Sequence, residues 1–180
     1  VERNISKMSE LLLEVQHLKK TFRTAGKAWN AVDDVSFTLK KGNVLGIAGE
    51  SGSGKSTIAK MITRLTETTE GTIYFAGKDI TKIRGKELRE YYRNIQMVFQ
   101  MPMESFDPRQ TLGDGIGEGL RSLGISRREA EKKAEQLLEK CGLDASFAKK
   151  YPHETSGGEC QRAAIARALA VGPQILICDE

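Results

Sequence analysis

The chain has 180 residues, of which 39% are hydrophobic and 29% charged, and it carries a formal net charge of +4. This composition favours a soluble globular protein, and the length is enough for an α/β domain with a sizeable core. No apolar run approaches the roughly 18 residues of a membrane span, and the mild positive charge suits a phosphate ligand or an acidic membrane surface without requiring nucleic acid.

Three segments have the alternating or β-rich pattern of strands, namely Leu11–Leu18, Val35–Leu39 and Thr72–Phe75. We expect them to form a small antiparallel sheet. His17 is expected on this sheet, where a lone histidine has a structural role more often than a ligand-binding one.

The stretch Gly49–Thr57 satisfies the pattern G-x-x-x-x-G-K-[ST]. Val44–Ala48 before it has the pattern of a short buried strand, and Thr57–Arg64 after it that of a helix. Glycines leave room for backbone N–H groups to turn toward a polyphosphate, and the positive end of the new helix points at the same anion. Lys55 can reach the β- and γ-phosphates, and the Ser56 hydroxyl can bind Mg²⁺.

Phe22 and Trp29 lie between the first two predicted strands, where we expect a loop containing Gly26. An exposed aromatic ring upstream of a phosphate loop could stack on adenine. We prefer Phe22 for this role. The alternative, in which Phe22 packs and Trp29 stacks, stays open.

Ile95–Phe99 has the pattern of another buried strand, and Gln100 follows at its C-terminal end. Ligands of open α/β sheets bind outside the carboxyl ends of the strands. Gln100 is therefore placed where it could touch Mg²⁺ or an attacking water.

Residues 101–125 are expected to be loop-rich because they contain two prolines and a run of glycines. A helix is predicted from Ser126, which begins a capping-box pattern with Glu129 and is followed by a helical apolar stripe that ends before Gly142. Residues 101–160 are thus predicted to be a mostly helical insertion.

A second helix is predicted over Arg162–Ala170, with Ser156 as its cap. Gly157 and Gly158 expose backbone N–H groups at its N-terminus, which gives the chain a second anion-binding helix end. An ordinary capped helix is the simpler alternative.

The last stretch, Gln174–Glu180, is an apolar strand that ends in two acids. Asp179 is placed to hold Mg²⁺ through water, and Glu180 could polarise a water for attack on a γ-phosphate.

In order and spacing, these features resemble the nucleotide-binding domain of an ATP-binding cassette (ABC) transporter. Four motifs carry the resemblance: the Walker A loop at Gly49–Thr57, the Q-loop at Gln100, the signature motif at Ser156–Glu159 and Walker B at Ile175–Glu180. Walker A alone leaves many NTPase families open, and the signature motif narrows the choice to this one.

The resemblance implies an α/β fold, with a P-loop NTPase core, an antiparallel β subdomain and a helical insertion. The expected organisation is a single truncated domain in which residues 1–9 are disordered, 10–100 form the antiparallel β subdomain and the first part of the core, 101–160 the helical subdomain, and 161–180 the signature helix and the Walker B strand. In this family the strand after Walker B lies between the Walker A and Walker B strands. We therefore expect a gap in the central sheet and a piece of a longer ATPase that hydrolyses ATP poorly.

The resemblance also implies ATP and Mg²⁺ as cofactors. Catalytic roles fall to Lys55, Gln100 and Glu180, and Mg²⁺ ligation to Ser56, Gln100 and Asp179. The residues expected to bind nucleotide are Phe22, Gly49, Ser51, Gly52, Ser53, Gly54, Lys55, Ser56 and Thr57, together with Ser156, Gly157, Gly158 and Glu159, which would contact a nucleotide bound mainly by a partner chain.

The implied partners are a second ATP-binding subunit, packed head to tail, and transmembrane permease subunits at the cytoplasmic side of the membrane, with a substrate-binding protein acting indirectly. Ser105–Arg109 and Tyr151–Glu154 resemble the subfamily that imports oligopeptides, dipeptides or nickel, and His153 belongs to this lead-in. Two alternatives stay open: a soluble ABC ATPase that acts on nucleic acid or ribosomes, and a non-catalytic nucleotide-binding module.

The signature differs from the usual Leu-Ser-Gly-Gly-Gln, because Thr155 stands in place of Leu and Glu159 in place of Gln. A carboxylate at Glu159 would repel a γ-phosphate unless it is protonated or turned away. We therefore expect weaker signature contacts.

Overall fold

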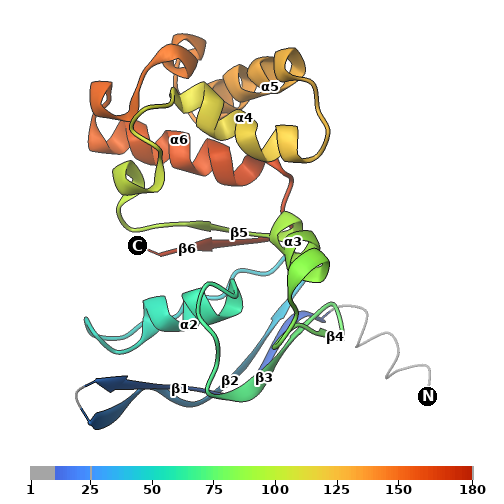
Figure 1. Ribbon diagram of the computed structural model, residues 1–180, viewed down its shortest axis with the longest axis vertical. Coiled ribbons are helices and arrows are strands. Elements are labelled where there is room, and N and C mark those ends of the chain that lie inside the picture. Colours follow the sequence, from blue (N-terminus) through green and yellow to red (C-terminus); the bar gives the residue numbers. More distant parts are fainter. Residues whose placement is uncertain (1–10, 25, 180) are drawn as a thin grey trace. The chain divides into compact units, whose positions relative to one another are not determined.

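The computed structural model describes residues 11–24 and 26–179, and these divide into two compact units. The first unit ends at Arg89 and the second begins at Glu90, inside helix α3 (Gly85–Asn94). Figure 1 labels the elements of both units. Each unit has buried residues of its own, so the two are described separately.

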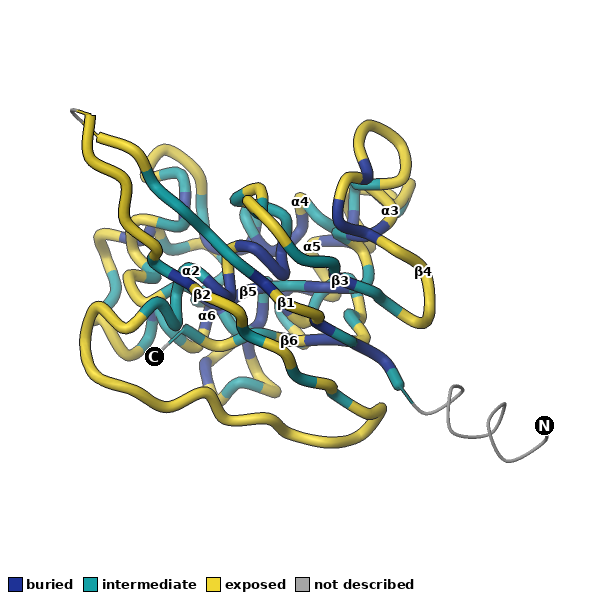
Figure 2. The backbone as a smooth tube through the Cα atoms, turned by 90° about the horizontal axis from the view of Figure 1, so that it is seen from below, coloured by how far each residue is buried: buried dark blue, intermediate teal, exposed yellow. Residues whose placement is uncertain are grey.

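An antiparallel sheet of four strands dominates the first unit, in the order β2-β1-β3-β4. Its strands are β1 (Leu11–Thr24), β2 (Lys27–Lys40), β3 (Glu70–Phe75) and β4 (Lys78–Asp79). The three predicted strands and their antiparallel arrangement are confirmed, and β4 is added. Figure 2 shows the buried stretches of β1 and β3 and the exposed tip of the β1–β2 hairpin.

Strands β1 and β2 extend further than predicted, as far as the pair Thr24–Lys27 beside Gly26. Phe22 pairs with Trp29 across this ladder, so the prediction that both aromatic residues lie on a loop is wrong. Aromatic residues directly opposite each other stabilise an antiparallel pair, and this contact extends the hairpin beyond the buried part of the sheet.

The β1 ladder is interrupted at His17, which has a φ of 50°, and the facing residue Asp34 has a φ of 52°. The register with β2 shifts between Val15 and Leu18. His17 Nδ1 lies 2.7 Å from Asp34 Oδ1, and the His17 backbone N–H donates to Ser36 Oγ over 2.8 Å. These contacts give His17 the structural role that the sequence predicts.

Helix α2 (Lys55–Ile62) contacts β2 and buries the side chains of Ile58, Ala59, Met61 and Ile62. It begins two residues before the predicted start at Thr57 and ends two residues before Arg64. Arg64 has a φ of 59°, a left-handed conformation that cannot continue the helix.

The predicted buried strand at Val44–Ala48 is wrong. Residues 43–50 have no strand assignment, and Val44, Leu45 and Ile47 are 99%, 44% and 43% exposed. The apolar pattern does match a strand, but no strand among the described residues pairs with this segment. Without a partner, the segment has neither a hydrogen-bonded ladder nor a covered face.

Three helices pack together in the second unit, which also holds a parallel pair of strands (Figure 1). Its elements after α3 are β5 (Ile95–Val98), α4 (Leu112–Ser122), α5 (Arg127–Lys140), α6 (Gly157–Ala170) and β6 (Ile175–Cys178), with 3-10 turns at Pro102–Ser105, Ala145–Lys149 and Pro152–Glu154. Helix α5 begins after its predicted cap, since Ser126 Oγ accepts the Glu129 N–H over 3.4 Å. The predicted stop is also confirmed, with Gly142 left-handed just beyond the helix at a φ of 76°.

Helix α4 lies inside the stretch that the sequence predicts as loop-rich, so that prediction is wrong for residues 112–122. Each interior glycine costs a helix roughly 1 kcal/mol relative to alanine, which is why the pattern favoured a loop. Leu112, Ile116 and Leu120 recur every four residues and are at most 2% exposed. Burying each of these side chains contributes about 1.5–3 kcal/mol, enough to outweigh the glycines. A side chain at Gly113 would also meet the Ala148 carbonyl oxygen, so a glycine here permits close packing.

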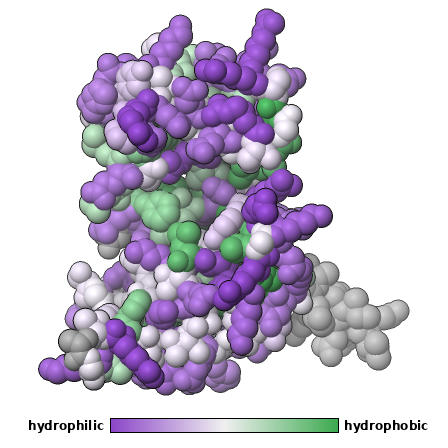
Figure 3. Space-filling model, in the orientation of Figure 1, coloured by the Kyte–Doolittle hydropathy of each residue, from purple (hydrophilic) through white to green (hydrophobic). Residues whose placement is uncertain are grey.

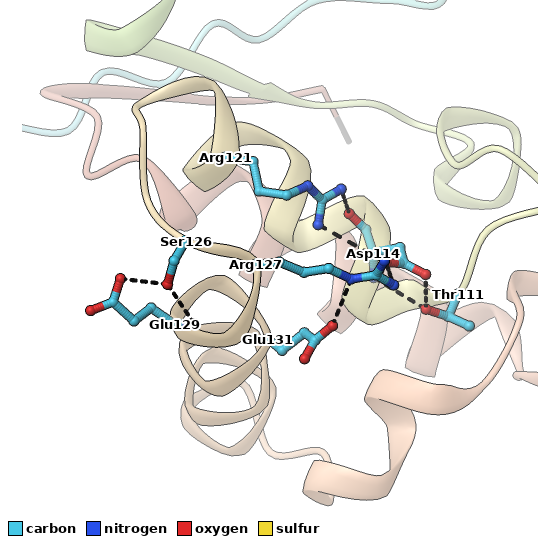
Figure 4. Close-up of polar contacts among 7 residues, drawn as sticks. All are labelled: Thr111, Asp114, Arg121, Ser126, Arg127, Glu129 and Glu131. Carbon is cyan, nitrogen blue, oxygen red and sulfur yellow. Dashed lines mark hydrogen bonds and ion pairs between the residues drawn. The ribbon is translucent and has the colours of Figure 1, made fainter.

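A polar network ties the start of α4 to the start of α5 (Figure 4). Thr111 caps α4 and donates its hydroxyl to Asp114 Oδ2 over 2.9 Å. Arg121 Nη2 donates to the Asp114 carbonyl oxygen over 3.0 Å, and Arg127 Nη2 lies 3.8 Å from Asp114 Oδ1. Asp114 is thus held from its own helix and from the next, which fixes the corner between the two helices.

Hydrophilic side chains cover most of the face seen in Figure 3. The large hydrophobic side chains that remain exposed include those of Val44, Ile47, Met101 and Met103. In the sequence, Val44 and Ile47 precede the phosphate loop of the first unit, and Met101 and Met103 follow Gln100 in the second unit.

Replacement of Gly71 by alanine tests the bulge at His17. Gly71 and Gly77 have φ values of 88° and 78°, but only at Gly71 would a Cβ overlap backbone, at the carbonyl oxygens of Gln16 and His17. We expect Gly71→Ala to lower the free energy of unfolding by about 3 kcal/mol and Gly77→Ala by about 1 kcal/mol. Urea unfolding followed by the fluorescence of Trp29, the only tryptophan, measures both. Equal losses in the two variants would contradict the close contact.

Candidate functional site

The turn into helix α2 requires glycine at position 54. Gly54 is the N-cap of α2 with a φ of 97°, and an added Cβ would overlap the carbonyl oxygen of Ala31 on β2. The Ser53 N–H donates to the Glu50 carbonyl oxygen over 3.2 Å, which closes the preceding turn. At Gly49 the constraint is weaker, because an added Cβ would lie 2.6 Å from Ser53 Oγ, a side-chain atom that can move. The loop is therefore compact and packed on the sheet.

The Lys55 ammonium is folded back over the loop. Its Nζ donates to the carbonyl oxygens of Gly49 and Glu50, each over 2.8 Å. An ammonium has three N–H donors, so these contacts leave a further donor for an anion bound above the loop.

The open end of α2 is well suited to an anion. The first turn of the helix contains no acidic residue, and its N-cap makes no side-chain hydrogen bond. Ser51, Gly52 and Ser53 are exposed, while Ser56 and Thr57 are half-buried. The positive end of the helix dipole and the loop N–H groups are thus not neutralised by a carboxylate of the first turn.

The aromatic pair lies on the same sheet. The ring centroids of Phe22 and Trp29 are 5.1 Å apart at an interplanar angle of 35°, and Lys20 Nζ lies 5.1 Å from the centroid of Phe22. Trp29 is 54% exposed, whereas Phe22 is half-buried between its neighbours. Either ring can present a face to a base, and the choice of Phe22 stays a prediction.

In the second unit, the carboxyl ends of β5 and β6 lie side by side. The strands are parallel, with Val98 opposite Cys178, and the Asp179 N–H donates to the Val98 carbonyl oxygen over 3.0 Å. Gln100 follows two residues after Val98 and is exposed, and Asp179 is half-buried. The structure therefore brings Gln100 and Asp179 to one edge of the sheet, as the sequence predicts, while Glu180 lies outside the described residues.

Helix α6 begins with a complete capping box. Ser156 Oγ accepts the Glu159 N–H over 3.3 Å, and the Ser156 backbone N–H donates to Glu159 Oε2 over 2.8 Å. The Ser156 hydroxyl also donates to Glu159 Oε2 over 2.9 Å. Gly157 and Gly158 are exposed beside this box. The predicted cap is confirmed, and Glu159 turns its carboxylate onto Ser156.

The two hydrogen bonds from Ser156 lower the pKa of Glu159 below its ordinary value, so this carboxylate is ionised at neutral pH. Protonation, one of the two ways in which Glu159 could avoid repelling a phosphate, is therefore disfavoured, and the charged carboxylate is hydrogen-bonded to Ser156.

The predicted site residues fall into two groups. Phe22 and Gly49–Thr57 belong to the first unit, and Gln100, Ser156–Glu159 and Asp179 belong to the second. A joint Mg²⁺ site of Ser56, Gln100 and Asp179 would span both units and stays a prediction. Sequence reasoning missed Ala31, because it contributes a backbone carbonyl group and nothing in its side chain signals that contact.

Comparison with known proteins identifies the relatives of this chain. A family model for ABC transporters matches residues 32–180. The chain is 47% identical over 176 residues to the oligopeptide transport ATP-binding protein OppF of Bacillus subtilis, which covers 96% of the chain and 58% of that protein. It is 42% identical over 174 residues to the dipeptide transport ATP-binding protein DppF of Lactococcus lactis, covering 94% and 56%. The chain thus spans about half the length of the curated relatives it matches.

Solved structures give the same result for the fold. The ATP-binding cassette MJ0796, in a dimeric post-hydrolysis state bound to ADP and Pi, superposes with a TM-score of 0.85 at 31% identity, covering 94% of this chain and 74% of that one. CbiO1 of Clostridium perfringens, part of the ABC transporter complex CbiONQ, superposes with a TM-score of 0.78 at 26% identity, covering 95% and 66%. The predicted ABC ATPase fold is confirmed.

The pH dependence of stability tests the capping box of α6. Because the pKa of Glu159 is lowered in the folded state, its charged contacts stabilise the protein above the ordinary pKa of 4.5 and are lost as the pH falls through the lowered value. We expect Glu159→Gln to be less stable than wild type at pH 7, with a difference that shrinks on acidification. Urea unfolding followed by circular dichroism measures the difference, with Glu139→Gln, at an exposed position of α5, as the control. A difference that is independent of pH would contradict the assignment.

Proposed function

The chain belongs to the ABC transporter family, and on that premise we propose that it is the ATP-binding part of a subunit that hydrolyses ATP to power a peptide importer. The observation that carries the proposal is the phosphate loop. Gly54, Lys55 and the start of α2 form a compact loop without acidic residues in the first helical turn, which supports an anion site there.

Phosphate binding follows from the chemistry of this loop. Backbone N–H groups from Gly49 to Thr57 would donate to the β- and γ-phosphates, and Lys55 would exchange a loop carbonyl group for a phosphate oxygen. This exchange replaces a neutral acceptor by a charged one and strengthens the hydrogen bond. Phe22 or Trp29 would stack on adenine.

The oxygen donors of Ser56, Gln100 and Asp179 fit Mg²⁺, which takes few protein ligands and completes its shell with phosphate oxygens and water. When bound, Mg²⁺ supplies neutralisation of charge on the transferred phosphoryl group. Gln100 would sense the γ-phosphate from the end of β5, and Glu180 would accept a proton from the attacking water.

The partners follow from the same proposal. Ser156, Gly157, Gly158 and Glu159 would contact a nucleotide held by a second ATP-binding subunit, and the dimeric state of MJ0796 supports such an arrangement. The exposed residues Met101 and Met103 after Gln100 would face permease subunits. The protein would then act at the cytoplasmic face of the membrane, with a substrate-binding protein on the other side. Among the described residues, no helix is long and apolar enough to cross a membrane itself.

The names of the relatives support peptides as the transported substrates, because they are oligopeptide and dipeptide transport proteins. The motifs Ser105–Arg109 and Tyr151–Glu154 are common to peptide and nickel importers in our proposal, so nickel remains the second substrate class. Transport assays with the assembled importer, comparing uptake of a labelled oligopeptide and of Ni²⁺, distinguish the two.

We expect this chain of 180 residues to bind nucleotide but to hydrolyse it slowly. Val44–Ala48 leads directly into the phosphate loop, and it lacks a paired strand among the described residues. A phosphate loop that is not held by a paired strand at its N-terminal side would position the γ-phosphate less accurately. Small displacements lower the rate of catalysis far more than they lower the affinity. Mg-dependent turnover of several ATP per second by this chain would contradict this expectation.

Nucleotide binding can be tested directly with Lys55→Ala. Removing the ammonium should weaken Mg-ATP binding at least tenfold, or about 1.4 kcal/mol, because a charge-assisted phosphate contact is lost. Lys60→Ala is the matched control, since Lys60 is an exposed lysine on the same helix. Isothermal titration calorimetry gives the affinities, and Trp29 fluorescence reports whether adenine approaches the aromatic pair. Equal affinity in both variants would rule out the assigned loop.

A further inference from the structure

Arg167 on helix α6 makes an unusual set of contacts. Its Nη1 donates to the Ser105 carbonyl oxygen over 2.5 Å, and its Nη2 donates to Ser105 Oγ over 2.9 Å. The centre of the guanidinium also lies 4.3 Å from the ring centroid of Phe106, which is 5% exposed. One side chain thus holds two consecutive residues that lie about sixty positions away in the sequence.

These contacts have no anionic partner. Burial lowers the pKa of Arg167, Cys160 and Glu118 act on it in the opposite direction, and within the described part of the chain its guanidinium forms no ion pair. A half-buried cation that forms no direct ion pair is costly unless its N–H groups are satisfied and an aromatic face covers it. Ser105 meets the first condition and Phe106 the second. The contacts of Arg167 therefore favour this one position of residues 105 and 106 relative to α6.

The segment that Arg167 holds is the one that follows Gln100. The turn Pro102–Ser105 is closed by Ser105 Oγ, which donates to the Pro102 carbonyl oxygen over 2.6 Å while it accepts from Arg167. This turn carries Met103, which is 44% exposed, and follows Met101, which is 57% exposed. One exposed methionine therefore lies on this turn and the other directly precedes it, and Arg167 of α6 holds the end of the turn.

Helix α6 connects this turn to the other candidate residues of the second unit. Its N-terminus is the Ser156 capping box, and after its C-terminal end the chain enters β6 and reaches Asp179. Arg167 lies eleven residues after Ser156, about 16 Å along the helix axis. A helix of this length is stiff, so a displacement at Arg167 also moves the Ser156 end.

We propose that Arg167 is a positioning residue that fixes Pro102–Phe106 on helix α6, so that the turn after Gln100 and the Ser156 end of α6 move as one body. The consequence for transport rests on the proposed function, in which a partner engages Met101 and Met103. A displacement of Met101 and Met103 by that partner would then be transmitted to the Ser156 end of α6, with no flexible segment between the turn and the helix.

Hydrogen exchange measured by mass spectrometry on the full chain, without nucleotide, tests the clamp independently of ATP binding. We expect Arg167→Met to accelerate exchange of the backbone N–H groups of residues 103–107 at least tenfold, while exchange in α5 stays unchanged. Arg162→Met, which removes an exposed arginine from the same helix, is the control and should leave both segments unchanged.

Two further variants separate positioning from general stability. Ser105→Ala removes only the Oγ contacts and should accelerate the same segment to a smaller extent. Arg167→Lys keeps the charge but not the fork of two donors, so it should behave like Arg167→Met. Three results would each overturn the proposal. Residues 103–107 could stay fully protected in Arg167→Lys, their exchange could be unchanged in Arg167→Met, or exchange in α5 could be accelerated equally in all variants.

Discussion

A glycine backbone in a left-handed conformation, pressed against the carbonyl group of Ala31, is the constraint on which the phosphate loop depends. At Gly54 the chain must turn from the loop into α2 while passing within contact distance of β2. A side chain here would have to displace the sheet or the helix. The turn sets the direction of α2, and with it the direction of the helix dipole and the position of Lys55.

The same contact links the loop to the aromatic pair. Ala31 and Trp29 are two residues apart on β2, or about 7 Å along the strand. The strand that receives Gly54 therefore also carries the ring that could stack on a base. In the proposed nucleotide site, a single β-hairpin would thus support both the phosphate end and the adenine end.

The second unit relies on different interactions, the hydrogen bonds that side chains make at the start of helix α6 and along it. Helix α6 satisfies its first N–H groups with Ser156 and Glu159, and it holds the turn at Ser105 through Arg167. The carboxylate of Glu159 replaces the amide that the family uses, and it engages the Ser156 hydroxyl that a nucleotide phosphate would need. If a nucleotide binds at this end of α6 as proposed, Glu159 would have to release that hydroxyl, a cost that a glutamine would lower.

Local patterns predicted the parts of the structure that are determined locally. Gly49–Thr57, the capping residues Ser126 and Ser156 and the antiparallel strands could all be recognised because turn chemistry, capping and period-2 alternation act within a few residues.

The predictions that were wrong, and the contacts that were missed, all depend on whether distant segments of the chain meet. Helix α4 forms despite its glycines because Leu112, Ile116 and Leu120 are buried by neighbours that the local pattern does not reveal. Val44–Ala48 has the composition of a strand but no partner for its backbone within the described residues. The contacts of Arg167 with Ser105 and of Gly54 with Ala31 likewise join positions that no local pattern connects.

Hydrogen exchange of the phosphate loop, with and without nucleotide, tests the central claim most directly. Mg-ATP should slow exchange of the backbone N–H groups of Gly49–Thr57, because they would donate to the β- and γ-phosphates, whereas AMP, which has neither, should leave them unchanged. Unaltered exchange with Mg-ATP, or equal protection by AMP, would contradict the claim that this loop binds the polyphosphate.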